Sequence, residues 1–324
     1  MGGQRLGIEV PGARAEEVLS RIRHAEELGI HSAWLTTGGT AVGGGGVRRD
    51  SLALLAAAAA QTDRIALGTA ILVTWPRHPI AVVEYVQIVD QIAPGRFRLG
   101  LGTSGKAIVE QAYGTRFTAP MSQLREYVKI TRTILTEASV DFRGDYYSST
   151  GIIAAPVDVP VMISAVQPGA FEVAGAETDG AISWICPMTY LRDHALPAIQ
   201  KGADSVGRPT PPLIAHAIIC VHDDEEEAKE AFLERFTMYM GRPNYARMFT
   251  TAGYPEVNEG VWSDGMIKSV MYSGNEEQVA QSLAELFAIG PQEVFVTPLA
   301  AGSDRAASFD RALRLVGSVA KSLN

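Results

Sequence analysis

Short apolar runs alternate with segments of helical period along almost the whole chain. This alternation is typical of strand-helix units around a parallel sheet. The predicted strands are Leu6–Glu9, Ser32–Thr36, Ile65–Thr69, Phe97–Gly102, Val161–Ser164, Ala181–Trp184, Leu213–Val221 and Glu293–Thr297. About eight such units in one chain favour a (β/α)8 TIM barrel over a doubly wound sheet. We therefore expect a single α/β barrel domain over residues 1–324.

Helices are expected between these strands. The segment Ala13–Leu28 carries apolar residues every three or four positions and stops before Gly29, a residue that commonly ends helices. Asp50 and Asn275 stand where N-caps are expected. The pattern thus predicts where several helices begin and end.

Three segments exceed a simple barrel, at about residues 38–47, 140–155 and 238–272. Long insertions after barrel strands usually form the substrate mouth. The first is rich in glycine and lacks the Lys-Ser/Thr ending of a phosphate-binding loop, so we interpret it as a lid or loop tip. The second alternates like a hairpin around Arg143-Gly144, which favours a structural role.

Two of the predicted strands end in the same way, at Gly68-Thr69 and at Gly102-Thr103. Ligands bind at the carboxyl ends of parallel strands. Glycine at such an end lets a flat ligand approach the backbone. The repeated ending indicates a site for a flat ligand at these strands.

Composition narrows the function. The formal net charge of −8 without a basic cluster argues against nucleic-acid binding. The most apolar run, Leu52–Ala60, is too short to span a bilayer, so we expect a cytoplasmic protein. Cys186 and Cys220 are far apart, and the six histidines lack metal-ligand spacing, so we expect neither a disulfide framework nor a metal site.

Several motifs, taken in order, resemble the bacterial-luciferase-like oxidoreductases. They are Arg64-Ile65-Ala66-Leu67-Gly68-Thr69-Ala70-Ile71, Arg77-His78-Pro79, Gly95-Arg96-Phe97-Arg98-Leu99-Gly100-Leu101-Gly102, Leu124-Arg125-Glu126-Tyr127 and Thr178-Asp179-Gly180. The similarity runs from about residue 5 to the end of the chain. Each motif is weak alone, and their ordered sum carries the resemblance.

Within that superfamily the chain looks most like the methylenetetrahydromethanopterin reductases. The motifs behind this are Gly7-Ile8-Glu9, Gly102-Thr103-Ser104-Gly105-Lys106, Ile163-Ser164-Ala165-Val166-Gln167-Pro168 and Thr297-Pro298-Leu299-Ala300-Ala301-Gly302-Ser303-Asp304. The resemblance implies a (β/α)8 barrel that forms a homodimer, and hydride transfer between the deazaflavin coenzyme F420 and a small organic substrate. Neighbouring family members instead bind FMN and act as monooxygenases.

The resemblance also implies which residues hold the cofactor. The family often has a non-proline cis peptide that forms a bulge against the ring, and the matching bond here is Ala70-Ile71. The cofactor residues implied are Thr36, Thr37, Gly68, Thr69, Ala70, Ile71, Gly102, Thr103, Ser104, Lys106, Ser164, Ala165, Val166 and Gln167. The last four precede a helix opened by Pro168, where free N–H groups can face a phosphate. Taken singly, these residues also fit ordinary strand ends and turns.

Glu9 is the candidate catalytic residue. It ends the first strand and matches a carboxylate that the reductases place near the transferred hydride. Buried beside an apolar ring, a carboxyl group stays neutral to higher pH and can exchange a proton during hydride transfer. The other interpretation is a carboxylate that caps the following turn or pairs with an arginine.

The chain departs from the family at two positions. Where members commonly have an Asp-His pair, Thr36 is followed by Thr37 and Gly38, and Gly105 replaces a carboxylate of the reductases. These changes put the pterin substrate in doubt. Two alternatives therefore stay open: an FMN-dependent monooxygenase, and a non-catalytic flavin-binding barrel. The match of Gly100, Gly102 and Gly105 to a dinucleotide-binding motif lies in the fourth unit, where chance explains it better.

Overall fold

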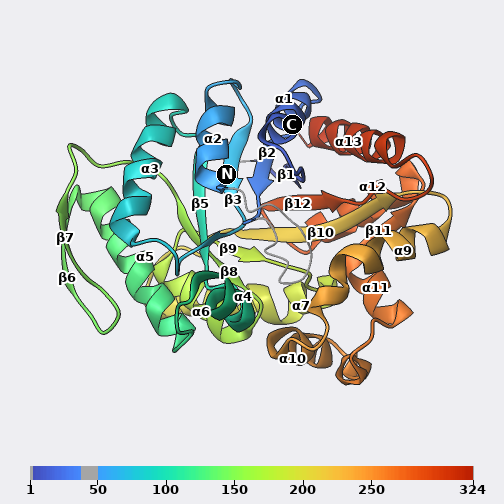
Figure 1. The fold of residues 1–324 in the computed structure, drawn as a ribbon. Coiled ribbons are helices and arrows are strands. Elements are labelled where there is room, and N and C mark those ends of the chain that lie inside the picture. The colour runs from blue at the N-terminus through green and yellow to red at the C-terminus, as the bar shows by residue number, and fades with distance from the viewer. Residues whose placement is uncertain (1–2, 38–49, 324) are drawn as a thin grey trace.

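The computed structural model describes residues 3–37 and 50–323, and within them eight parallel strands close into a barrel (Figure 1). The strands are β1 (Arg5–Glu9), β2 (Ser32–Leu35), β3 (Ala66–Thr69), β5 (Phe97–Gly102), β8 (Val161–Ala165), β9 (Ala181–Ser183), β10 (Leu213–Val221) and β12 (Glu293–Pro298). They are neighbours in chain order, and pairing of β12 with β1 closes the ring. The (β/α)8 barrel and all eight predicted strands are confirmed.

Helices surround the barrel (Figure 1). The outer helices are α1 (Ala15–Glu27), α2 (Ser51–Ala59), α3 (Pro79–Ile92), α5 (Pro120–Glu137), α6 (Pro168–Glu177), α8 (Leu196–Ser205), α12 (Glu276–Ala288) and α13 (Arg305–Ser322). As predicted, α1 is followed by Gly29 at a φ of +83°. Asp50 caps α2 by accepting the N–H of Ala53 at 2.8 Å, and Asn275 caps α12 in a reciprocal capping box with Gln278. None of the helices in the described ranges is long and apolar enough to cross a membrane.

Further elements decorate this frame. They are β4 (Leu72–Val73), α4 (Lys106–Tyr113), β6 (Ser139–Arg143), β7 (Ser148–Ile152), α7 (Met188–Tyr190), the π-helical turn η1 (Leu191–Ala195), α9 (Glu225–Phe236), the 3-10 turns η2 (Thr237–Tyr239) and η3 (Pro255–Glu259), α10 (Pro243–Thr251), α11 (Asp264–Val270) and β11 (Met271–Gly274). The insertion at 140–155 holds the predicted hairpin, since β6 and β7 pair antiparallel. The insertion at 238–272 holds short helices and β11, and 38–47 lies outside the described residues.

The inside of the barrel has an apolar middle and two polar ends. Alternate side chains of a barrel strand point inward, and on β12 these are Glu293, Phe295 and Thr297. Phe295 belongs to an apolar cluster that also contains Trp34, Ala70, Met162, Ile182 and Ile214. Glu293 lies at the strand starts, and Thr297 lies at the strand ends. The cluster therefore separates two buried polar groups along one axis.

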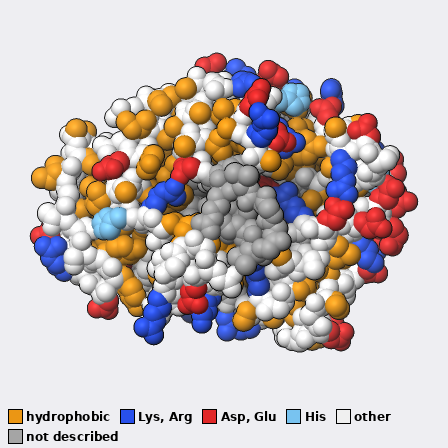
Figure 2. Space-filling model, viewed as in Figure 1, with side chains coloured by type: hydrophobic (Ala, Val, Ile, Leu, Met, Phe, Trp, Pro, Cys, Tyr) orange, Lys and Arg blue, Asp and Glu red, His pale blue; other side chains and the backbone are white. Residues whose placement is uncertain are grey.

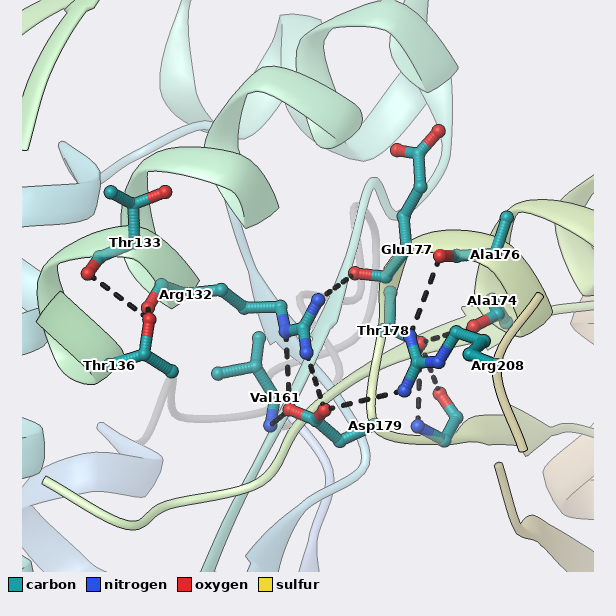
Figure 3. A network of polar contacts seen from close by, with 11 residues as sticks. Arg132, Thr133, Thr136, Val161, Ala174, Ala176, Glu177, Thr178, Asp179 and Arg208 are labelled. Atoms are coloured by element: carbon teal, nitrogen blue, oxygen red, sulfur yellow. Dashed lines mark hydrogen bonds and ion pairs between the residues drawn. The ribbon is translucent and has the colours of Figure 1, made fainter. Parts of the chain in front are cut away.

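Asp179 is the centre of a polar network on the outside of the strand starts (Figure 3). Arg132 of α5 donates to both Asp179 carboxylate oxygens, at 2.7 and 3.3 Å, and to the carbonyl oxygen of Glu177 at 2.6 Å. Asp179 also accepts the N–H of Val161 at 2.9 Å. Because these bonds join α5, β8 and the turn before β9, the Thr178-Asp179-Gly180 motif holds the frame together.

Candidate active site

Glu9 lies at the carboxyl end of β1 with 2% of its surface exposed. Thr36, just after β2, donates to its Oε1 at 3.0 Å, and Thr297 of β12 donates to its Oε2 at 2.7 Å. Arg235 of α9 donates to both oxygens. Strands β2 and β12 flank β1 in the barrel, so both hydroxyls reach the carboxylate from adjacent strands. An arginine that donates to both carboxylate oxygens matches the interpretation of Glu9 as an arginine partner.

His216 lies behind Thr297 on β10, and the sequence analysis missed it. Its Nε2 is 2.8 Å from the Thr297 hydroxyl, and its Nδ1 accepts the N–H of Ile185 at 3.2 Å. The ring stacks on Trp184 with centroids 3.8 Å apart. Burial, and then the charge of Arg235, hold the pKa of His216 well below its usual range. The available signal was one histidine within a strand that is otherwise apolar or cysteine.

The predicted cis peptide at Ala70-Ile71 is present. It lies between β3 and β4, which both pair with β5. Gly68 pairs with Arg98 and Leu72 pairs with Leu101. The β3–β4 segment therefore advances by four residues where β5 advances by three. The extra residue is the bulge that the resemblance implies. Ala70 is buried and Ile71 is half-buried at this edge of the barrel.

Two of the predicted cofactor residues at this strand end are used by the fold itself. Thr69 is fully buried, and its hydroxyl donates to the carbonyl oxygen of Gly100 at 2.8 Å and accepts the Gly100 N–H at 2.9 Å. A Cβ at Gly68 would come within 2.4 Å of the Trp34 ring. The glycine therefore makes room for a core tryptophan, and the Thr69 side chain bridges β3 to β5. Thr37 donates to the carbonyl oxygen of Ile71.

The second strand end brings three predicted residues together. A Cβ at Gly102 would lie 2.5 Å from the Ser164 hydroxyl and 2.7 Å from a side-chain carbon of Ile71. The glycine thus lets side chains from β8 and from the bulge meet across β5. Thr103 is half-buried, and Ser104 is half-buried at a φ of +57°. Lys106 is exposed at the first turn of α4.

The segment Ser164–Gln167 links β8 to α6. Ser164 and Val166 are half-buried and Ala165 is buried. Gln167 is the N-cap position of α6, yet its side chain donates to the carbonyl oxygen of Asn244 in α10 at 2.7 Å. No side chain of the described residues caps this helix. Pro168 has no N–H, and the N–H groups of Ala170 and Phe171 are bonded to the carbonyl oxygen of Gln167, so the N–H of Gly169 is the first-turn donor left for a ligand.

Two tyrosines of the insertion at 238–272 lie near the Glu9–Arg235 ion pair. Tyr239 of η2 and Tyr245 of α10 meet edge to face at 5.1 Å. Burial raises the pKa of both phenols; for Tyr239, Arg242 and then Trp184 oppose this rise, followed by smaller effects of the Glu9 and Arg235 charges. Both phenols therefore stay neutral. In the described ranges no group of three or more His, Cys, Asp and Glu residues could hold a metal ion.

The luciferase-like monooxygenase family profile matches residues 2–293. An F420-dependent glucose-6-phosphate dehydrogenase of Nocardia farcinica is 33% identical over 231 residues, which cover 64% of this chain and 66% of that protein. The matched regions span 66%, 50% and 65% of three such relatives, so the chain covers less than two thirds of their length.

Two solved structures share the fold. An F420-dependent secondary alcohol dehydrogenase in complex with an F420-acetone adduct superposes with a TM-score of 0.82 at 20% identity, over 98% of this chain and 99% of that one. The coenzyme F420-dependent tetrahydromethanopterin reductase of Methanopyrus kandleri superposes with a TM-score of 0.79 at 22% identity, over 99% of both chains. At these identities the likeness concerns the fold alone.

Proposed function

The chain belongs to the luciferase-like monooxygenase family, and on this premise we propose that it transfers a hydride between coenzyme F420 and a small organic substrate. The observation that carries the proposal is the buried Glu9 carboxylate at the strand ends of a barrel that also has the Ala70-Ile71 bulge. The names of the curated relatives support F420 over FMN.

The residues at the strand ends fit a flat, polar-edged ring with an anionic tail. Ala70 and Ile71 offer an apolar wall. Thr103, Ser104 and Ser164 offer half-buried hydroxyls for the polar edge. The Gly169 N–H at the start of α6 and the Lys106 ammonium would attract the tail. The Thr69 hydroxyl is already bonded to the backbone of Gly100, so Thr69 supports this surface by joining β3 to β5 and offers the ring no hydrogen bond.

F420, when bound, supplies the acceptor or donor of the hydride. Glu9 accepts the proton that leaves the substrate on oxidation, and returns it on reduction. Arg235 and the two threonines hold the carboxylate in place, and burial keeps bulk water away from it. Trp184 and Tyr239 form the aromatic side of the same region.

Titration of F420 into the purified protein tests the cofactor assignment. We expect saturable quenching of F420 fluorescence, and no comparable binding of FMN. F420 reduction is then followed by absorbance with glucose 6-phosphate and with 2-propanol, the substrates that the names of similar proteins suggest. Tight FMN binding without F420 affinity would favour the monooxygenase. Binding of neither flavin would overturn the proposal.

The homodimer is also a proposal, and it rests on an apolar surface. Tyr85, Ile88 and Ile92 of α3 are 45%, 51% and 42% exposed, and Ile152 of β7 is 84% exposed; we call these four residues the α3 patch. Figure 2 shows hydrophobic side chains on the left part of this face, where α3 and the hairpin lie in Figure 1. Beside the patch lies a cavity of about 300 Å³ lined by Ile80, Val83, Glu84, Gln87, Ile134 and residues 151–154. Such a surface fits a second copy of the chain.

Light scattering of the eluted protein tests the dimer. We expect a mass twice the 34.6 kDa of one chain, and dissociation in Ile88→Glu. Val206→Glu is the matched control, because Val206 is similarly exposed at 56% but lies outside the patch. A wild-type mass of one chain would contradict the dimer. The cytoplasmic location stays a prediction.

A further inference from the structure

A chain of three hydrogen bonds leads from the backbone of Ile185 to the carboxylate of Glu9. Ile185 N–H lies 3.2 Å from Nδ1 of His216, Nε2 of His216 lies 2.8 Å from Oγ1 of Thr297, and that hydroxyl lies 2.7 Å from Oε2 of Glu9. A backbone N–H can only donate, so Nδ1 must be the unprotonated nitrogen. The hydrogen on Nε2 therefore points to Thr297. The hydroxyl has one proton, which is left for Glu9.

The surroundings keep His216 in this single form. The residue is 2% exposed, and its ring stacks on the Trp184 ring. The positive charge of Arg235 further disfavours a second proton on the imidazole. His216 therefore has no free lone pair to take a proton from a substrate, and its bond toward Glu9 is the one to the Thr297 hydroxyl. It can act only through Thr297.

We propose that His216 and Thr297 are positioning residues that fix the orientation and proton affinity of the Glu9 carboxylate. The imidazole occupies one side of the Thr297 hydroxyl and thereby commits the hydroxyl proton to Oε2 of Glu9. This inference rests on the proposed function, in which Glu9 exchanges the substrate proton.

The other groups that act on Glu9 come from three elements. Arg235 reaches it from α9, Thr36 from the end of β2, and Tyr239 faces it from η2. These groups are unchanged in variants of His216 and Thr297. A difference between such variants in the titration of Glu9 therefore reports on the His216–Thr297 chain.

Nitrogen NMR of the histidine-labelled wild-type protein tests the tautomer without any substrate. The His216 signals, assigned by their loss in His216→Gln, are expected to show hydrogen on Nε2 alone and no titration from pH 5.5 to 8.5. A hydrogen on Nδ1, or a titration of His216 within this range, would overturn the proposal. The measurement needs no variant beyond the one used for assignment.

Carbon NMR of the glutamate carboxyl groups tests the effect on Glu9, assigned with Glu9→Gln. In Thr297→Val the pH midpoint of the Glu9 signal should rise by about half a unit to one unit, the value of one lost hydrogen bond. Thr297→Ser should restore the wild-type midpoint. His216→Phe should also raise the midpoint, and His216→Gln, which keeps a donor near the Nε2 position, should not.

A double variant separates positioning from general disturbance of the fold. If His216 acts through Thr297, adding His216→Phe to Thr297→Val changes the midpoint no further. Additive shifts, or equal midpoints in Thr297→Val and wild type, would refute the chain of action. F420 binding is measured separately by fluorescence. Loss of that binding alone would remove the proposed function and leave the coupling to Glu9 intact.

Discussion

The two ends of the barrel each hold a buried carboxylate paired with an arginine. Glu293 and Glu9 are both 2% exposed. Glu293 of β12 pairs with Arg98 of β5, a strand separated from β12 by β1, β2 and β3, and both partners are enclosed. Glu9 pairs with Arg235 of α9, whose side chain is 33% exposed. The same two residue types therefore form a closed pair at the strand starts and an open pair at the strand ends.

In the closed pair, the Glu293 carboxylate is surrounded by buried side chains of the barrel. Glu293 accepts from Ser32 at 2.5 Å and from Trp34 at 2.8 Å besides Arg98, and Arg98 stacks 4.4 Å above the Trp34 ring. Burial raises the pKa of Glu293, but Arg98 and the neutral donors outweigh burial and hold the pKa below its usual value. Every partner of this carboxylate is part of the frame. Glu9 instead has one partner from α9, outside the barrel strands, and two hydroxyls at the open end.

Breaking the closed pair should have the largest effect. Glu293→Gln leaves the Arg98 charge buried without a counter-charge, and we expect a loss of about 3–5 kcal/mol in the free energy of unfolding. Glu9→Gln is the matched control, since Arg235 can be hydrated in part, and its loss should be near 1 kcal/mol. Urea unfolding measures both. Equal losses would show that the two pairs serve the same purpose.

For turnover, unlike for stability, we expect Glu9→Gln to have a larger effect than Glu293→Gln. General acid-base groups typically contribute 100-fold or more to a rate, so F420 reduction should fall by at least about that factor. Affinity for F420 should change by less than about threefold, because glutamine keeps the size of the side chain. Unchanged turnover would remove Glu9 from the mechanism.

The frame could be predicted from the sequence because its signals are local. The strands Phe97–Gly102 and Leu213–Val221 have the predicted bounds, since apolar runs and their punctuation set them. Motifs such as Thr178-Asp179-Gly180, which carried the family resemblance, turn out to hold the frame together. A resemblance built on such residues identifies a fold well and a substrate poorly.

The site was less predictable because its contacts join distant parts of the chain. Arg235 lies 226 residues from Glu9, and nothing in the sequence pairs them. His216 lies 81 residues from Thr297, and a search for metal-ligand spacing passes over it. Only the inward register of β10 and β12 brings these side chains together. Its place at a strand end and the family resemblance made Glu9 a candidate, and the barrel geometry identified its hydrogen-bond partners.

Acid should weaken the two ends in separate pH windows. The unfolded chain protonates His216 near its usual pKa of 6.5, whereas the folded protein keeps the imidazole neutral to lower pH. The free energy of unfolding therefore falls as pH drops below about 6.5, by up to about 1.4 kcal/mol per pH unit. The stability contributed by Glu293 is present above its usual pKa of 4.5 and is lost as pH falls further.

Unfolding measured from pH 8 to 5 in wild type and in His216→Gln isolates the first window. The variant lacks the titrating imidazole, so its stability should vary less with pH between 6.5 and 5. Identical slopes in the two proteins would mean that His216 takes up its proton over the same pH range in the folded and unfolded states, which would contradict the lowered pKa. Below pH 4.5, Glu293→Gln should lose less stability on acidification than wild type does, which assigns the second window to the strand starts.

The smallest expected effects come from two variants at the strand ends, one at a residue of the frame and one at a residue of the proposed site. Thr69 is fully buried, with its hydroxyl bonded to Gly100, while Ser164 is half-buried and its hydroxyl makes no hydrogen bond to other residues of the described ranges. Thr69→Val should therefore lower the free energy of unfolding by about 1–2 kcal/mol, because it strands two buried backbone groups. Ser164→Ala should change stability by less than about 0.5 kcal/mol. It should weaken F420 binding by about fivefold, the value of one hydrogen bond. If Ser164→Ala instead destabilises the protein and leaves F420 affinity unchanged, this strand end belongs with the frame, and the site begins farther out along the barrel axis.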